Sequence, residues 1–315
     1  MVGRAALLLC ALAAALPEAA HAQSPESLAW LKKIQEATRN LSYSGTFVYQ
    51  QGKQSETSRI TRLASADVEK LEVLDGLPRE LVRSKDTVRC YLPQAKVVKV
   101  EQRTPDRNFP ALLPERINAL AQHYDIALGE TRRIAGFECQ SVNLTPKDNL
   151  RYGYHLYADR ASGMLIGAVT VDSTGNQIEQ FMFTQLAIGH VTPEMVKPRQ
   201  TAAGWRVEDA EAAPTILTGW TLKPELPGFQ KVVELKRRME SKAVGQVVFS
   251  DGLAAVSVFI EPLDGRRDPP RTGLASLGAI HIYTREVANH MVTVVGEAPA
   301  ASVQRIANAV EYRRP

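Results

Sequence analysis

Cysteine, long apolar runs and an excess of charge of one sign are all scarce in this sequence of 315 residues. Three cysteines are too few for a small scaffold held together by disulfides. The longest apolar run, residues 5–16, is shorter than the roughly 20 residues that a membrane-spanning helix needs. The net charge is only +4, and Lys and Arg are interspersed with Asp and Glu, unlike a nucleic-acid-binding surface. We therefore expect a water-soluble globular protein that does not bind nucleic acid.

Motifs of catalysis and cofactor binding are absent as well. The chain contains no Gly-x-Ser-x-Gly, no Walker-type glycine loop, no His-Glu-x-x-His and no Gly-x-Gly-x-x-Gly. The histidines after residue 22 lack the spacing of metal ligands, and they are His123, His155, His190, His281 and His290. We expect a binding protein without cofactor or metal. A hydrolase with a dispersed site remains an alternative.

The N-terminus has the layout of a secretory signal peptide. Arg4 precedes the apolar run, and Ala20-His21-Ala22 forms a small-x-small cleavage site. We therefore expect residues 1–22 to be removed on export. Leu9 directly before Cys10 fits a lipoprotein cleavage site poorly, so we do not expect a lipid anchor.

The cysteines that remain after cleavage are Cys90 and Cys139. A disulfide persists in an oxidising compartment, and we predict that these two residues pair. The alternative is that each is a buried thiol on a strand.

The length and the distribution of proline predict two domains. About 290 residues remain after cleavage, which exceeds the usual size of a single core. Hydrophobic periodicity lapses in a stretch rich in Pro, Ala and Gly, where we place a linker over 198–216. The first domain is then 23–197 and the second is 217–315.

The first domain is predicted to be one long antiparallel sheet with helices on one side. Ser24-Pro25 is a typical helix start, and a second helix is expected over 110–124. Alternation places Tyr43, Phe47 and Tyr49 on one face of a strand. A long sheet curls, and helices on one side then leave a concave apolar surface for a lipid or peptide. Such aromatic stripes are more often plain core.

The second domain is predicted to be a smaller α+β unit. Asp251-Gly252 between two apolar runs is the strongest hairpin signal in the chain. Pro299 is expected to begin a helix with Val303, Ile306 and Ala307 on one side. Residues 262–272 are expected to form an exposed loop.

Several separated segments, in the same order, resemble the MucB/RseB family of periplasmic sigma-E regulatory proteins. The resemblance spans nearly all of the chain after the signal peptide, and none of its segments is a catalytic motif. The segments are LSYSGTFVY (41–49), LDGLPRE (74–80), PKDNLRYGY (146–154), Gln180-Phe181, FSDGL (249–253) and VGEAP (295–299).

The resemblance implies a half-barrel domain similar to the lipoprotein carriers of the LolA type, followed by a smaller domain. It also implies a partner, the periplasmic part of a membrane anti-sigma factor of the RseA or MucA type. Binding would shield that partner from a regulatory protease, and lipid A or lipoprotein-like lipids would weaken this binding. A homodimer is a further expectation. The rival function is a periplasmic lipid or lipoprotein carrier of the LolA type, although a simple carrier has no evident use for the second domain.

Residues are assigned to these roles by their chemistry, since aromatic and arginine side chains are the usual anchors of an interface. For the lipid surface we predict Phe47, Tyr49, Tyr91, Phe181 and Phe183. For the partner surface we predict Trp220, Phe229, Phe249, Phe259, Arg271 and Tyr283. Arg79-Glu80 and Arg151 lie in the family-like segments, and a structural ion pair near a turn explains them at least as well as a functional role.

Overall fold

A computed structural model describes residues 24–85, 87–102, 113, 117–209, 212–224, 226–239, 242–263 and 272–313. The predicted signal peptide 1–22, Cys10, Arg271 and most of the expected loop 262–272 lie outside the described residues, as do 110–112 and 114–116 of the expected second helix. No helix in the described ranges combines the length and the apolar character needed to cross a membrane.

The first domain contains one twelve-stranded sheet in the order β12-β6-β5-β4-β3-β2-β1-β11-β10-β9-β8-β7. Its helical elements are α1 (Pro25–Asn40), η1 (Ala64–Ala66), α2 (Ile117–Leu120) and η2 (Pro193–Val196). Its strands are β1 (Tyr43–Gln51), β2 (Gln54–Leu63), β3 (Val68–Val73), β4 (Glu80–Arg83), β5 (Thr87–Leu92), β6 (Val97–Gln102), β7 (Tyr124–Ile134), β8 (Phe137–Pro146), β9 (Gly153–Asp159), β10 (Leu165–Val171), β11 (Gln177–Ile188) and β12 (Arg206–Asp209).

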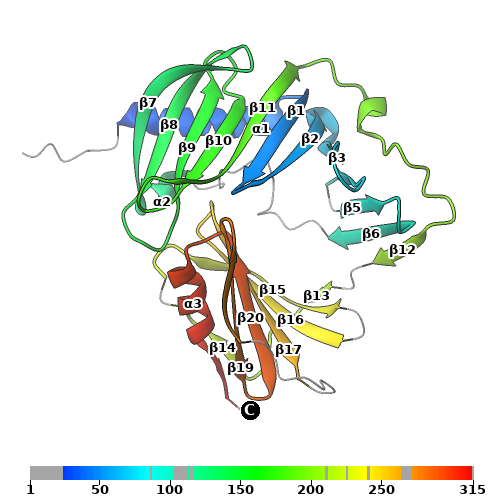
Figure 1. The fold of residues 1–315 in the computed structure, drawn as a ribbon, viewed down its shortest axis with the longest axis vertical. Coiled ribbons are helices and arrows are strands. Elements are labelled where there is room, and N and C mark those ends of the chain that lie inside the picture. Colours follow the sequence, from blue (N-terminus) through cyan, green and yellow to red (C-terminus); the bar gives the residue numbers. More distant parts are fainter. Residues whose placement is uncertain are drawn as a thin grey trace, which may run out of the picture.

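Helix α1 lies across one face of this sheet and contacts β7, β8 and β10 (Figure 1). It begins as the sequence predicts, because the side chain of Ser24 accepts a hydrogen bond from the backbone N–H of Ser27 and Pro25 occupies the first turn. Its buried side chains, Leu31 and Ile34, join the sheet's core. The predicted sheet with helices on one side is confirmed.

The second domain is built on a seven-stranded sheet in the order β13-β15-β16-β17-β20-β19-β18. Its elements are β13 (Ala212–Pro214), β14 (Trp220–Leu222), β15 (Gln230–Met239), β16 (Lys242–Ser250), β17 (Ala255–Pro262), β18 (Gly273–Leu277), β19 (Ile280–Val287), β20 (His290–Gly296), α3 (Ala300–Asn308) and β21 (Val310–Tyr312). Helix α3 packs on β19 and β20 and buries Val303, Ile306 and Ala307, so the predicted α+β unit is confirmed.

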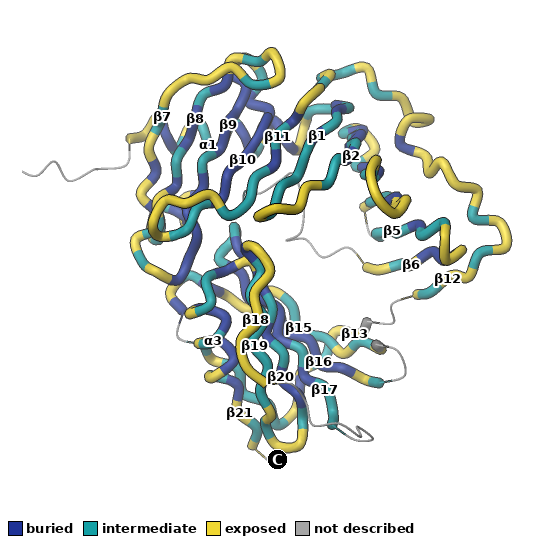
Figure 2. The backbone as a smooth tube through the Cα atoms, viewed as in Figure 1, coloured by how far each residue is buried: buried dark blue, intermediate teal, exposed yellow. Residues whose placement is uncertain are grey.

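Each domain has its own core. The larger core gathers around β8–β10, β1 and β11, and the smaller one lies between the seven-stranded sheet and α3. Figure 2 shows buried residues along β9 and β10, while several hairpin tips are exposed.

The segment 198–216, expected to be a linker, supplies a strand to each domain. Strand β12 pairs in parallel with β6, with Arg206 opposite Val97, and β13 pairs with β15 of the smaller sheet. Asp209 therefore ends a strand of the first domain, and Ala212 begins a strand of the second.

The predicted disulfide is wrong in this structure, because Cys90 and Cys139 are both free thiols. Cys90 lies on β5 and Cys139 on β8, and seven strands separate β5 from β8 in the sheet order. A disulfide needs Cα atoms within about 7 Å of each other, which only close neighbours satisfy. The alternative of thiols on strands is the one observed, with Cys139 fully buried and Cys90 half-buried.

Candidate functional site at the domain junction

The two domains meet at a buried arginine. The side chain of Arg151 is 0 % exposed, and its Nε lies 3.3 Å from Oδ2 of Asp251, which is 1 % exposed. Arg151 also donates through Nη1 to Asp148 at 2.9 Å and through Nη2 to the backbone carbonyl of Pro227. Its guanidinium carbon stands 5.3 Å from the centre of the Phe229 ring. One cation thus contacts groups from both domains.

Local turns bring these groups into position. The Asp148 carboxylate accepts the backbone N–H of Leu150, which shapes the loop that ends at Arg151. Asp251 directly follows β16, and its Oδ1 accepts the backbone N–H groups of Leu253 and Ala254 at 3.0 and 2.9 Å. The Oδ2 of Asp251 is therefore free to face Arg151, while Oδ1 holds the turn.

Tyr124 adds a hydrogen bond to the same carboxylate. Its hydroxyl donates to Oδ2 of Asp251 at 3.4 Å. Burial first, and the Asp251 charge second, raise the pKa of Tyr124 well above its ordinary value. The phenol therefore stays protonated at physiological pH and remains a donor to Asp251.

Further contacts interlock the two cores. The Ser302 hydroxyl donates to the Leu150 carbonyl at 2.7 Å, and the Leu150 side chain belongs to the smaller core. The Tyr152 hydroxyl donates to the Ala279 carbonyl at 3.3 Å, and Ala279 packs in the larger core. Each domain thus buries a residue of the other.

A glycine permits close approach at this junction. Gly228 has a φ of +82°, and a Cβ atom there would lie 2.3 Å from Nε2 of His123. The ring of His123 therefore rests directly on the loop that supplies Pro227 and Phe229. Burial and then the charge of Arg151 lower the pKa of His123.

The predicted lipid-surface residues separate into two groups. Phe47, Phe181 and Phe183 are 2–4 % exposed and pack edge to face, with ring centres 5.8–6.3 Å apart. Tyr49 lies farther along β1 and donates to Glu179 at 2.6 Å. Tyr91 lies on β5, in the other half of the sheet.

The cross-strand register explains why the phenylalanines meet. A bulge between Thr46 and Phe47 places Phe47 opposite Phe183, and Tyr49 opposite Phe181. In this structure the three phenylalanine rings are core side chains, as aromatic stripes most often are.

The predicted partner-surface residues are also dispersed. Phe229 lies under Arg151 at the junction, and Phe249 is buried in the smaller core. Trp220 is partly exposed and packs against Tyr312 with ring centres 4.9 Å apart. Phe259 and Tyr283 are half-buried on β17 and β19, and Arg271 lies outside the described residues. The sequence did not predict the contact of Arg151 with Asp251, although both lie in family-like segments.

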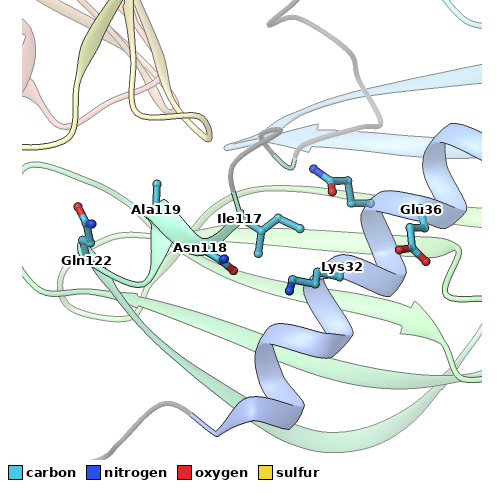
Figure 3. A pocket seen from close by; sticks show the side chains of 7 residues that line it. Lys32, Glu36, Ile117, Asn118, Ala119 and Gln122 are labelled. Carbon is cyan, nitrogen blue, oxygen red and sulfur yellow. The ribbon is translucent and has the colours of Figure 1, made fainter.

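A cavity of about 460 Å³ opens between α1 and α2 (Figure 3). Its lining is mixed in polarity, with Lys32, Gln35, Glu36, Ile117, Asn118, Ala119 and Gln122. Within the described ranges, no cluster of three or more His, Cys, Asp or Glu side chains is arranged to hold a metal ion.

Comparison with known proteins identifies both domains. Family models match the MucB/RseB N-terminal domain over residues 26–210 and the MucB/RseB C-terminal domain over 215–311. The sigma factor AlgU regulatory protein MucB of Pseudomonas aeruginosa is 31 % identical, over 91 % of this chain and 92 % of its own length. The sigma-E factor regulatory protein RseB of Escherichia coli K12 is 25 % identical, over 92 % of both chains. The crystal structure of MucB in complex with MucA(peri) is 27 % identical, with a TM-score of 0.71, and covers 92 % of this chain and 100 % of its own.

Proposed function

Because the chain belongs to the MucB/RseB family through both of its domains, we propose that it regulates a sigma factor by binding the periplasmic segment of a membrane anti-sigma factor. Binding of this MucA or RseA type of segment shields it from regulated proteolysis and so restrains sigma-E activity. The observation that carries the proposal is the similarity, along nearly the whole described chain, to MucB solved with MucA(peri).

The proposed site of action is the periplasm, where the expected signal peptide would deliver the chain. The proposed mechanism needs no reactive group, since a bound regulator protects a cleavage site by covering it. Partly exposed aromatics of the smaller domain, Trp220, Phe259 and Tyr283, are the candidate anchors for the partner. Phe229 and Phe249 are buried and are therefore not among the candidate anchors.

A lipid-like ligand is the proposed releasing signal. Phe47, Phe181 and Phe183 form an apolar cluster that an acyl chain would join if the sheet and helices parted, with Tyr49 at its margin. Tyr91 stands apart on β5 and would extend such a surface only along the sheet. A ligand that favours the parted state and a partner that favours the closed state oppose each other through one conformational equilibrium.

A reconstituted cleavage assay tests the function directly. The mature protein is added to the source organism's MucA-type periplasmic segment and its regulatory protease, with and without lipid A or lipoprotein. We expect protection that lipid reverses. If the protein binds no such segment at micromolar concentration, the regulatory function is wrong. If lipid binds but cleavage is unaffected, the protein is a lipid carrier. A homodimer remains a prediction, which sedimentation of the mature protein tests.

A further inference from the structure

The most unusual feature of the domain junction is a fully buried ion pair. Interfaces between domains of one chain are ordinarily polar and moderate in size, and relative motion is the default. Here both charged side chains are at most 1 % exposed. Removing two charges from water is costly, and the cost is recovered only with good geometry and additional hydrogen bonds.

Arg151 meets that condition through two hydrogen bonds, from Nη1 to Asp148 and from Nη2 to the Pro227 carbonyl, while its Nε faces Asp251 in an ion pair without a hydrogen bond. Its guanidinium reaches Asp148 in its own loop, the Pro227 carbonyl before β15 and the Asp251 carboxylate after β16. The guanidinium fork is planar and rigid, so these directions fix rotation as well as distance. An apolar contact of equal area would allow the domains to slide against each other.

The flanking contacts also constrain the rotation of one domain relative to the other. Ser302 and Leu150 join α3 to the Arg151 loop, and Tyr152 joins the start of β9 to Ala279 in the β18–β19 turn. Together with Arg151 they hold the junction at separate points of the smaller domain. Three anchored points determine the orientation of one rigid body on another.

We propose that Arg151 is a positioning residue for partner recognition, which sets the orientation of the two domains through Asp251 and so controls partner affinity without touching the partner. The inference rests on the proposed function. Because its side chain is 0 % exposed, Arg151 acts on a partner only through the arrangement of the domains.

Asp251→Asn is the sharpest variant. Asn retains the oxygen that accepts the N–H groups of Leu253 and Ala254, so the turn is preserved. It removes the charge and can place an amide donor against the Arg151 fork. Asp172→Asn is the matched control, since Asp172 caps a hairpin turn in the same way, through Thr174 and Asn176, but is only partly buried.

Two quantities are measured on the mature chain. Spin labels at Glu130→Cys and Glu286→Cys, on exposed positions of the two domains, report the interdomain distance in a background with Cys90→Ser and Cys139→Ala. The affinity for the source organism's MucA-type periplasmic segment is measured separately, without labels.

We expect Asp251→Asn to broaden the distance distribution and to weaken binding at least tenfold, while Asp172→Asn matches the unsubstituted protein. Arg151→Lys keeps the positive charge but lacks the planar guanidinium, so it should give an intermediate loss of affinity. This variant also tests the proposal if Asp251→Asn does not fold. A broadened distribution with unchanged affinity would overturn the inference, as would weaker binding at an unchanged distance. Failure of the unsubstituted protein to bind would instead refute the proposed function, and this inference with it.

Discussion

Replacing Phe47 by Ala tests whether its ring stabilises the core or lines a preformed lipid-binding surface. Phe47 is 3 % exposed and makes edge-to-face contacts with Phe181 at 6.3 Å and Phe183 at 5.8 Å. Truncating a buried Phe costs about 3–5 kcal/mol. Of this, the two ring contacts account for about 1–3 kcal/mol. That loss is a large part of the roughly 5–15 kcal/mol that stabilises a typical native protein.

The assay is urea unfolding of the mature protein, followed by circular dichroism. Phe47→Leu retains most of the apolar volume and loses only the ring contacts, so it should cost about 1–3 kcal/mol. Leu77→Ala is the surface control, since Leu77 is 72 % exposed and should change stability by less than about 0.5 kcal/mol.

The reasoning fails if the free energy of unfolding of Phe47→Ala lies within about 1 kcal/mol of that of the unsubstituted protein and the variant nevertheless no longer binds lipid. Such a result would mean that the ring lines a standing ligand surface and contributes little to the core.

Three further predictions concern protons, thiols and a buried carboxylate. The pKa of His123 is lowered in the folded protein, so the unfolded chain binds a proton more readily, and the free energy of unfolding should fall as pH drops through about 6.5. Thermal unfolding at a series of pH values measures this dependence, which should be shallower in His123→Asn. Mass spectrometry without reductant should find two free thiols, and Cys90 should react before Cys139, whose pKa burial raises to about 11. Glu80→Ala should cost about 1–3 kcal/mol in urea unfolding, because the buried Glu80 carboxylate accepts the backbone N–H of Arg199 at 3.0 Å.

Local chemistry made most of the fold predictable. The cap at Ser24-Pro25, the alternation through Tyr43 and Phe47 and the helix after Pro299 each depend on a few neighbouring residues. The structure follows all of them. The segment 198–216 was harder, since two short strands that pair with distant partners leave little periodicity in the sequence.

The failures concern contacts between distant segments. Two cysteines in an oxidising compartment indicate a disulfide only if the sheet brings their strands together, and the order of twelve strands cannot be read from spacing. Likewise Arg151 and Asp251 each have an ordinary local explanation, one as an ion pair with Asp148 and the other as a turn residue. Their mutual contact depends on how the domains dock.

On the proposed function, the closed aromatic core would also limit which lipids can act as a releasing signal. Opening the core exposes Phe47, Phe181 and Phe183 to water. This exposure costs about 1.5–3 kcal/mol for each ring, or about 5–9 kcal/mol together. Each buried methylene of an acyl chain returns about 0.8 kcal/mol, so about 6–11 methylenes are needed to offset the opening. A ligand shifts such an equilibrium only by its preference for the open state. We therefore expect lipids with chains shorter than about six carbons to leave the partner protected at any soluble concentration, and release to rise steeply over the following five or six carbons. A series of acyl chain lengths in the cleavage assay measures this, and release by the shortest chains would show that the aromatic cluster is not what the signal opens.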